Sequence, residues 1–243
     1  MPPERKECKR DYDWHHHYWQ GKLGLCVSMF DEVAQVSETI DRLKPRISRM
    51  LVARSGEAIP EEWLPRLDWH GSFEDLSGSV SKWEVPAASL CRNFSALAES
   101  AIGFSEVEWW VFVTGDTVLL HEYGLERAIA DAAEKECVLA ACCAYGQEFH
   151  AADLTLADLE AGKGGGRKQL AGTSDFMPQL FMVASEALPA FRAIPITNKW
   201  TSEACLGDAF VSWAGEGWRA RRHLYAVKAA SYSDGVVHHA KYG

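Results

Sequence analysis

The stretch EWWVFVTGDTVLL, residues 108–120, decides the fold class. Its β-branched and aromatic run stops at Gly115-Asp116 and then becomes apolar again, which is typical of a buried strand in a parallel sheet. Ligands of open α/β sheets bind at the carboxyl ends of the strands, so Asp116 is a candidate to hold a metal or a phosphate-bearing ligand. The structural alternative is a turn, because Gly-Asp is common turn chemistry and Asp often caps a helix.

The part of the chain before this stretch predicts a strand–helix–strand unit. KLGLCVSM, residues 22–29, predicts the first strand, and apolar residues at helical spacing predict a helix over 31–44. Asp31 is the expected N-cap of that helix. A second strand over 48–53 is expected to open into a turn at 54–56. Such a unit is normally right-handed and belongs to a parallel sheet.

The remaining elements alternate in the manner of an α/β domain. Residues 57–85 are expected to form loop with short strand or helix pieces. After them, helices are expected from Pro86 and over 125–135 and 201–213. Strands are expected to end at Asp116 and to cover 137–145, 176–184 and 218–227, and a short apolar step follows at 234–241. The glycine-rich run at 162–168 lacks the GK[ST] of a P-loop. Residues 1–20 predict a polar leader, and residues 21–243 predict one domain without internal repeats.

Composition excludes several classes of protein. The formal net charge is −9, from 34 acids and 25 bases, which argues against a nonspecific nucleic-acid binder. The seven cysteines include no CxxC pair, so reduced thiols in a reducing compartment are expected. The charged N-terminus has no apolar signal region, and no run reaches the ~18 apolar residues of a membrane span. We therefore expect a cytoplasmic protein without a transmembrane segment.

Four stretches carry a resemblance to a known family: KLGLCVSMFDE, LCRNFSALAESA, WWVFVTGDTVLL and GVVHHAKYG. Together they resemble the nucleotide-sugar glycosyltransferases of the GT-A fold. The resemblance implies a single Rossmann-like α/β domain whose central, mostly parallel sheet is flanked by helices. It also implies transfer of a sugar, of the hexosyltransferase type, from a nucleotide-diphosphate donor to an acceptor that is a glycan, a lipid-linked molecule or a small molecule.

The resemblance further implies a divalent metal that bridges the donor's two phosphates. Asp116 stands for the acid of the DxD-type motif, and His238 or His239 stands for the histidine that often completes the metal shell. Thr114-Gly115-Asp116 keeps only the last acid of that motif, so metal affinity without nucleotide should be weak. Either Mn²⁺ or Mg²⁺ fits, and an imidazole ligand suits Mn²⁺ better. In an extended strand only one of two adjacent histidines faces a given site.

Donor-contact candidates come from strand ends, one helix and the C-terminal segment. Arg92 carries a planar fork that suits phosphate oxygens, although the residue taken alone is more readily interpreted as a surface helix residue. The other candidates are assigned mainly by position: Ser28, Met29, Phe30, Arg54, Ser55, Asn93 and Lys241. Phe30 is alternatively a core or helix-start aromatic, Asn93 a helix-surface amide and Lys241 a solvated lysine.

The acceptor side needs a general base or a carboxylate that stabilises a positive centre. TSEACLGDAFVSWAGEGW resembles the acidic helix that follows the sheet in this family, which makes Glu203 and Asp208 the candidates. Glu203 is alternatively a first-turn charge favoured by the helix dipole. Asp175 is a candidate to hold a sugar hydroxyl, and Trp200 is a candidate acceptor platform.

Two other kinds of function remain open. The incomplete DxD motif is compatible with a noncatalytic relative that binds nucleotide or a partner. An unrelated Rossmann-like hydrolase that uses Asp116 and a histidine on a metal is the second alternative. No GxGxxG follows the first strand, so a dinucleotide oxidoreductase is not expected.

Overall fold

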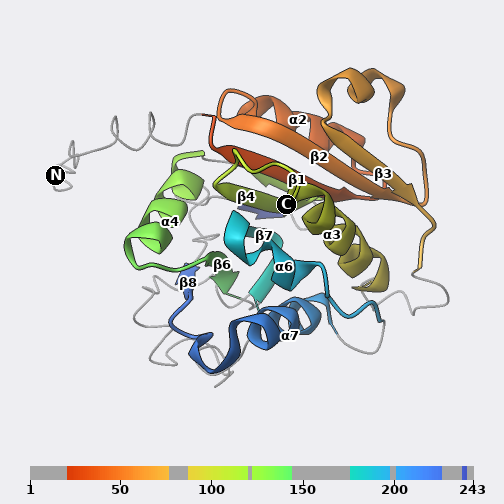
Figure 1. Cartoon of the computed structure of the whole chain (residues 1–243). Coiled ribbons are helices and arrows are strands. Elements are labelled where there is room, and N and C mark those ends of the chain that lie inside the picture. Colours follow the sequence, from red (N-terminus) through yellow and green to blue (C-terminus); the bar gives the residue numbers. More distant parts are fainter. Residues whose placement is uncertain are drawn as a thin grey trace, which may run out of the picture.

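The computed structural model describes residues 21–76, 87–119, 122–143, 176–197, 201–225 and 237–239. The leader expected over residues 1–20 and the glycine-rich run at 162–168 lie outside them. Within the described residues, seven strands form one sheet in the order β3-β2-β1-β4-β7-β6-β8 (Figure 1). Their bounds are β1 Leu23–Met29, β2 Ile47–Ser55, β3 Trp69–Phe73, β4 Trp109–Thr114, β6 Leu139–Cys143, β7 Phe176–Ala184 and β8 Arg222–Tyr225.

The sheet is mostly parallel, as the sequence predicts. β2 and β4 pair with the two sides of β1 in parallel, and β3 pairs in parallel with β2. β7 runs antiparallel to both β4 and β6, and β8 is parallel to β6. The carboxyl ends of β1, β2, β3 and β4 therefore meet at one edge of the sheet.

Helices cover both faces of the sheet. In Figure 1, α2 lies above the sheet, and α3, α6 and α7 lie below it. Together with α4, which packs on the same core as α2, these give a three-layer α/β domain. Their bounds are α2 Val33–Leu43, α3 Ala87–Ala101, α4 Glu122–Glu134, α6 Leu188–Phe191 and α7 Ser202–Ala214, with 3₁₀ turns η1 Glu61–Arg66, η3 Ser185–Ala187 and η4 Gly215–Gly217.

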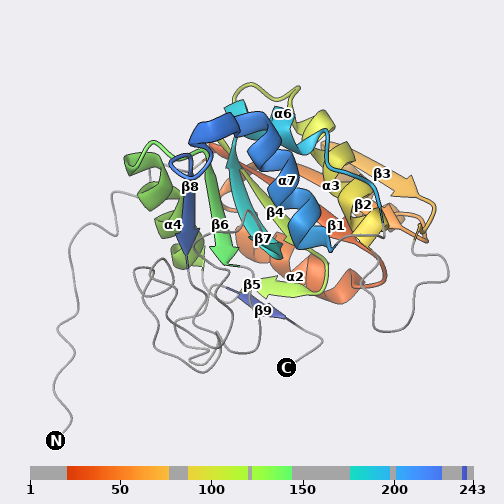
Figure 2. The same ribbon diagram turned by 90° about the horizontal axis from the view of Figure 1, so that it is seen from below.

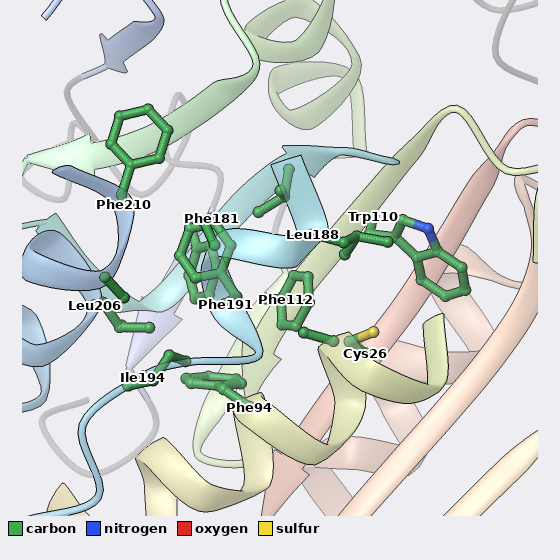
Figure 3. Close-up of a cluster of buried hydrophobic side chains, with 14 of the residues drawn as sticks. Cys26, Phe94, Trp110, Phe112, Phe181, Leu188, Phe191, Ile194, Leu206 and Phe210 are labelled. Carbon is green, nitrogen blue, oxygen red and sulfur yellow. The ribbon is translucent and has the colours of Figure 1, made fainter. Parts of the chain in front are cut away.

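The core below the sheet is built on aromatic side chains (Figure 3). Phe181 of β7 is fully buried and stacks on Phe112 of β4, with ring centroids 4.9 Å apart. Trp109 and Trp110, adjacent on β4, belong to the cores on the two sides of the sheet and so point to opposite faces. Burial of large apolar side chains of this kind contributes roughly 1.5–3 kcal/mol each.

Three expected boundaries are wrong. Helix α2 begins at Val33, and its N-cap is Glu32 instead of Asp31, without a side-chain capping hydrogen bond. The turn expected at 54–56 starts later, because β2 continues through Ser55 and only Gly56, at φ 87°, leaves the strand. The last strand of the sheet starts at Arg222 because a 3₁₀ turn occupies Gly215–Gly217.

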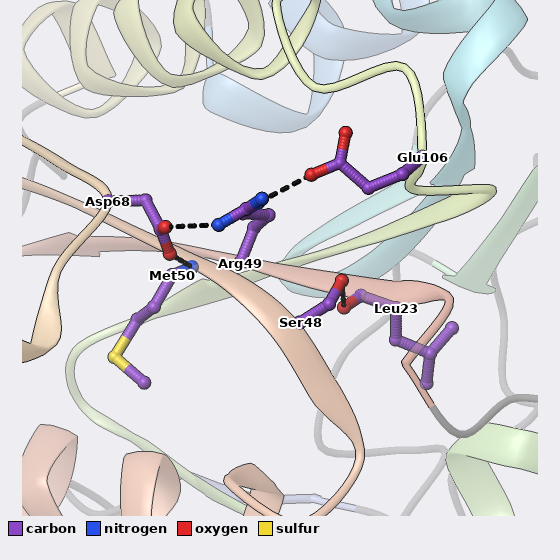
Figure 4. A network of polar contacts seen from close by, with 6 residues as sticks. All are labelled: Leu23, Ser48, Arg49, Met50, Asp68 and Glu106. Atoms are coloured by element: carbon purple, nitrogen blue, oxygen red, sulfur yellow. Dashed lines mark hydrogen bonds and ion pairs between the residues drawn. The ribbon is translucent and has the colours of Figure 1, made fainter.

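A polar network closes the amino-terminal edge of the sheet (Figure 4). Arg49 donates to Asp68 at 2.9 Å and to Glu106 at 2.5 Å, and Asp68 also accepts the Met50 backbone N–H. A backbone hydrogen bond and, after it, the Arg49 interactions hold the pKa of the exposed Glu106 carboxyl below its ordinary value. This network ties β2 to the segments that precede β3 and β4, at the edge opposite the strand ends considered below.

No helix within the ranges that the structure describes is long and apolar enough to cross a membrane.

Candidate functional site

The carboxyl edge of the sheet brings together the strand ends selected from the sequence. In the register, Ser28 of β1 lies between Ala53 of β2 and Thr114 of β4, and Met29 pairs with Arg54. Asp116 follows Thr114 by two positions and is partly exposed. The sequence prediction that Asp116 lies at the end of a buried strand is thus confirmed.

A second, two-stranded sheet joins this edge to the C-terminal segment. β5, Thr117–Leu119, pairs antiparallel with β9, Val237–His239, so that Thr117 lies opposite His239 and Val118 opposite His238 (Figure 2). Positions about 120 residues apart in the chain therefore lie side by side, one residue from Asp116.

Three threonines fix the turn that carries Asp116. The Thr114 and Thr117 hydroxyls are 2.8 Å apart and hydrogen-bonded, and both side chains are buried. The Thr39 hydroxyl of α2 donates to the Thr117 carbonyl at 3.2 Å. Helix α2 and strand β4 thus hold the start of β5 in place.

A carboxylate and an imidazole are donor types that suit Mn²⁺ and are compatible with Mg²⁺. The residue types at positions 116, 238 and 239 therefore fit such an ion. No group of three or more His, Cys, Asp or Glu side chains arranged to hold a metal occurs among the residues described.

Behind the edge, α3 connects the ends of β1 and β2 through Asn93. Its side-chain amide donates to the Ser28 hydroxyl at 3.1 Å, and the Ser55 hydroxyl donates to its carbonyl at 3.1 Å. All three residues are at most 2% exposed. Asn93 therefore acts as an internal clamp between the ends of two strands.

Arg92 lies at the ends of β2 and β3 and is not a free surface residue of α3. Its guanidinium donates to the Ser55 hydroxyl at 3.0 Å and lies 4.7 Å above the centre of the Phe73 ring. Its Nε atom is buried and has no hydrogen-bond partner in the part of the chain that the structure describes. Burial lowers the pKa of the Arg92 guanidinium, and Asp75 and Glu74 partly offset this. With its high intrinsic pKa, Arg92 stays a cation.

Arg54 is occupied by contacts within the protein. Its guanidinium donates to the Phe30 carbonyl at 2.6 Å and to the Ala58 carbonyl at 2.5 Å, and it forms an ion pair with Glu57. The residue is 5% exposed. Arg54 therefore anchors the loop after β1 to the segment after β2, and Phe30, half-buried, is held by this anchor.

Helix α7 brings one candidate acid toward the same edge. The Thr201 hydroxyl caps the helix by accepting the Ala204 N–H, and Glu203 lies in the first turn. Two positions on, the buried thiol of Cys205 is hydrogen-bonded to Cys91 of α3, whose pKa is raised by burial and further by Cys205 and Glu203. Glu203 therefore lies close to the buried interface between α3 and α7.

The other acceptor-side candidates differ from Glu203. Asp208 is exposed, whereas Glu203 is half-buried, which fits side chains that project from different faces of α7. Asp175, Lys241 and Trp200 lie outside the described residues.

Sequence reasoning missed Glu32, an acid at the end of β1 that is only 8% exposed. In the sequence it is indistinguishable from a first-turn helix acid, because Asp31 and Glu32 stand together before α2. An acid directly after a predicted strand end was the available signal.

Comparison with known proteins gives likenesses in structure alone. No protein-family model matches the chain, and no curated protein matches its sequence. The mannosyltransferase PcManGT from Pyrobaculum calidifontis, in complex with GDP-Man and Mn²⁺, is 13% identical over 91% of this chain and 65% of its own, with a TM-score of 0.49. A glycosyltransferase involved in the glycosylation of the major capsid of PBCV-1 is 12% identical over 89% of this chain and 91% of its own, with a TM-score of 0.44. The chain thus spans just under two thirds of the length of the mannosyltransferase.

Proposed function

We propose that the protein is a metal-dependent glycosyltransferase that moves a sugar from a nucleotide-diphosphate donor to a hydroxyl of a glycan, a lipid-linked molecule or a small molecule. The observation that supports this most is the pairing of β5 with β9 beside Asp116. It brings a carboxylate and the backbone of two histidines to the carboxyl edge of the sheet, where α/β domains bind ligands. Mn²⁺ or Mg²⁺ held there would neutralise charge on the departing diphosphate.

The sheet order separates the two ends of the proposed donor site. β2 is two strands from β4, and neighbouring strands are about 4.8 Å apart, so Arg92 at the end of β2 is on the order of 10 Å from the Asp116 turn. A single diphosphate does not span that distance. We therefore assign the diphosphate to Asp116 and the nucleoside to Arg92, which replaces the phosphate role expected from the sequence.

Between these ends lies the carboxyl end of β1. The backbone of Ser28, Met29 and Phe30 would line the middle of the donor site, and Arg54 would hold Phe30 in position through its carbonyl. Asn93 and Ser55 would support the strand ends from behind. Lys241 remains a candidate for the diphosphate end because it follows the histidines of β9 by two positions.

On the acceptor side, Glu203 is the better candidate for the reacting acid. It is half-buried and near Cys91 of α3, whereas Asp208 is exposed. A partly buried carboxylate can accept a proton from, or stabilise charge on, a substrate in a water-poor site. Asp175 is retained as a candidate to bind a sugar hydroxyl.

Replacement of Asp116 by Ala is expected to remove the dependence of nucleotide binding on Mn²⁺. Titration calorimetry with UDP, GDP, ADP and CDP, each with and without Mn²⁺, measures this. Of the four nucleotides, we expect the one that binds most tightly to have about tenfold or more higher affinity for the native protein with Mn²⁺ than without it, a difference of ~1.4 kcal/mol. The variant should bind this nucleotide with equal affinity in both conditions. Equal affinities with and without Mn²⁺ in the native protein would reject the metal-bridge mechanism.

The two histidines supply a matched pair of variants for the same titration. Paired positions of antiparallel strands share a face, so position 238 lies on the face of position 118. Position 239 shares the face of Thr117, which is buried. His238→Ala should therefore reduce the Mn²⁺ dependence more than His239→Ala.

Glu203→Gln is expected to slow sugar transfer by about a hundredfold while donor affinity stays unchanged, since loss of a general acid or base acts on the transition state. Single-turnover transfer from a radiolabelled nucleotide-sugar measures the rate, and calorimetry measures the affinity. Asp208→Asn is the companion variant. If both variants turn over normally, neither acid acts at the acceptor.

The same experiments separate the two alternatives. Donor binding without any turnover in the native protein would indicate a noncatalytic relative. Tight Mn²⁺ binding without nucleotide, with release of inorganic phosphate from phosphate esters, would indicate the hydrolase.

A further inference from the structure

Glu32 is a buried acid at the start of α2 whose side chain does not cap the helix. It is the N-cap of α2, yet its side chain makes no capping hydrogen bond to the helix. Instead, Oε2 of its carboxylate accepts the Phe30 N–H at 2.8 Å, which turns the side chain back toward the end of β1. The residue is 8% exposed. A charged group is seldom buried unless it makes specific contacts, so these contacts need an explanation.

The second neighbour of this carboxylate is Gly115. A Cβ atom added at position 115 would lie 2.7 Å from Oε2 of Glu32 and 2.8 Å from Cβ of Met29, closer than side-chain atoms approach. The glycine is therefore required by the close approach of Glu32 and β1. The Gly115 N–H donates to the Ser28 carbonyl at 2.7 Å, so the turn is held to β1 through its backbone as well.

We propose that Glu32 is a positioning residue whose carboxylate locks the loop after β1 to the turn that carries Asp116. The inference rests on the proposed function and extends it. In that function the loop at Phe30 lines the nucleotide site and Asp116 lies at the diphosphate end, so one side chain connects the two halves of the donor site. Through this contact, nucleotide binding and metal binding become coupled.

Three variants test how the contact works. Glu32→Gln keeps the size of the side chain and an oxygen that accepts the Phe30 N–H. Glu32→Ala removes the contact with Gly115. Gly115→Ala leaves the acid in the chain but takes its space. Glu38→Ala is the matched control, because Glu38 is an acid of the same helix whose ion pair with Arg42 is exposed.

Backbone amide hydrogen exchange of residues 28–34 and 112–118, read by mass spectrometry, reports the lock directly and needs no ligand. We expect exchange at Phe30 and at the Gly115–Asp116 turn to speed up about tenfold or more in Glu32→Ala, the size expected on loss of a hydrogen bond to a charged group. Gly115→Ala should give faster exchange at the same two places. Glu32→Gln and Glu38→Ala should exchange as the native protein does.

The functional readout is the ratio of UDP and GDP affinities with and without Mn²⁺, a quantity that a purely stabilising residue does not change. We expect Glu32→Ala and Gly115→Ala to reduce this ratio toward one with little change in metal-free affinity, and Glu32→Gln to preserve it. Any of three outcomes would overturn the positioning role. They are unchanged hydrogen exchange in Glu32→Ala, an unchanged affinity ratio despite faster exchange, and a Glu32→Gln variant that behaves like Glu32→Ala. If the native protein shows no Mn²⁺ dependence, the proposed function fails, and the exchange measurement still decides whether Glu32 locks the turn.

Discussion

Phe181→Ala is expected to lower the free energy of unfolding by about 3–5 kcal/mol, the usual cost of truncating a fully buried phenylalanine. The ring is completely buried at the centre of the core below the sheet. It stacks on Phe112 and meets Phe94 and Phe176 edge-on, with ring centroids 5.3 and 5.2 Å from its own. Each such pair adds roughly 0.5–1.5 kcal/mol beyond the buried area, so the loss should fall in the upper part of that range.

Urea unfolding monitored by tryptophan fluorescence measures the loss, with the slope of the transition compared between variants. Phe181→Leu retains most of the volume and should cost well under half as much. Ile196→Ala, at a side chain that is 51% exposed, should change the free energy by less than about 0.5 kcal/mol. A Phe181→Ala loss as small as that of Ile196→Ala would contradict the packed aromatic core.

Glu126→Ala is the second substitution with a large expected effect, again about 3–5 kcal/mol of unfolding free energy. Glu126 of α4 accepts from Arg46, at the entry to β2, with an N–O distance of 2.6 Å. The side chains are only 4% and 11% exposed. Removing the acid leaves the guanidinium charge in a buried position without this partner, and that penalty exceeds the value of the pair itself.

Two further variants show whether burial is the cause. Glu38→Ala breaks the Arg42–Glu38 pair of α2, whose side chains are 38% and 47% exposed, and should cost only about 0.3–0.5 kcal/mol. The double variant Arg46→Met with Glu126→Leu should recover much of the loss, because apolar side chains of similar volume replace buried pairs well. Equal losses for Glu126→Ala and Glu38→Ala would contradict a buried pair. Both can be measured by the same urea titration.

The sequence predicts which segments are helices and strands where the apolar pattern is strong. β7 has the bounds that the run FMPQLFMVA predicts, and α3 begins one residue after the expected Pro86. The direction of β7 was not predictable, because a fully buried apolar run has the same composition in a parallel and in an antiparallel strand. Strand direction depends on the length and path of the connections, which local patterns do not encode.

The sequence predicts where the candidate site residues lie better than it predicts what each of them does. Asp116 and Arg92 lie at the carboxyl edge as expected, since topology brings strand ends to one edge. Arg54 and Ser55 were expected in a turn, but their backbones continue the pairing of β2, a tertiary effect that outweighs turn propensity. Glu32 was missed because its partner Gly115 is 83 positions away, and no local pattern reports such a contact.

The pairing of β5 with β9 has a consequence for biosynthesis. The described residues of the aromatic core and of the seven-stranded sheet lie before residue 226, whereas β9 follows the strand that it joins by about 120 residues. The described strand pairing and buried side chains of the main sheet therefore do not depend on the histidine-bearing strand. A chain that ended between residues 226 and 236 would keep the seven described strands of the main sheet and lose β9, so we expect it to fold without the proposed ion-binding corner, and expression level alone is a poor guide to competent protein.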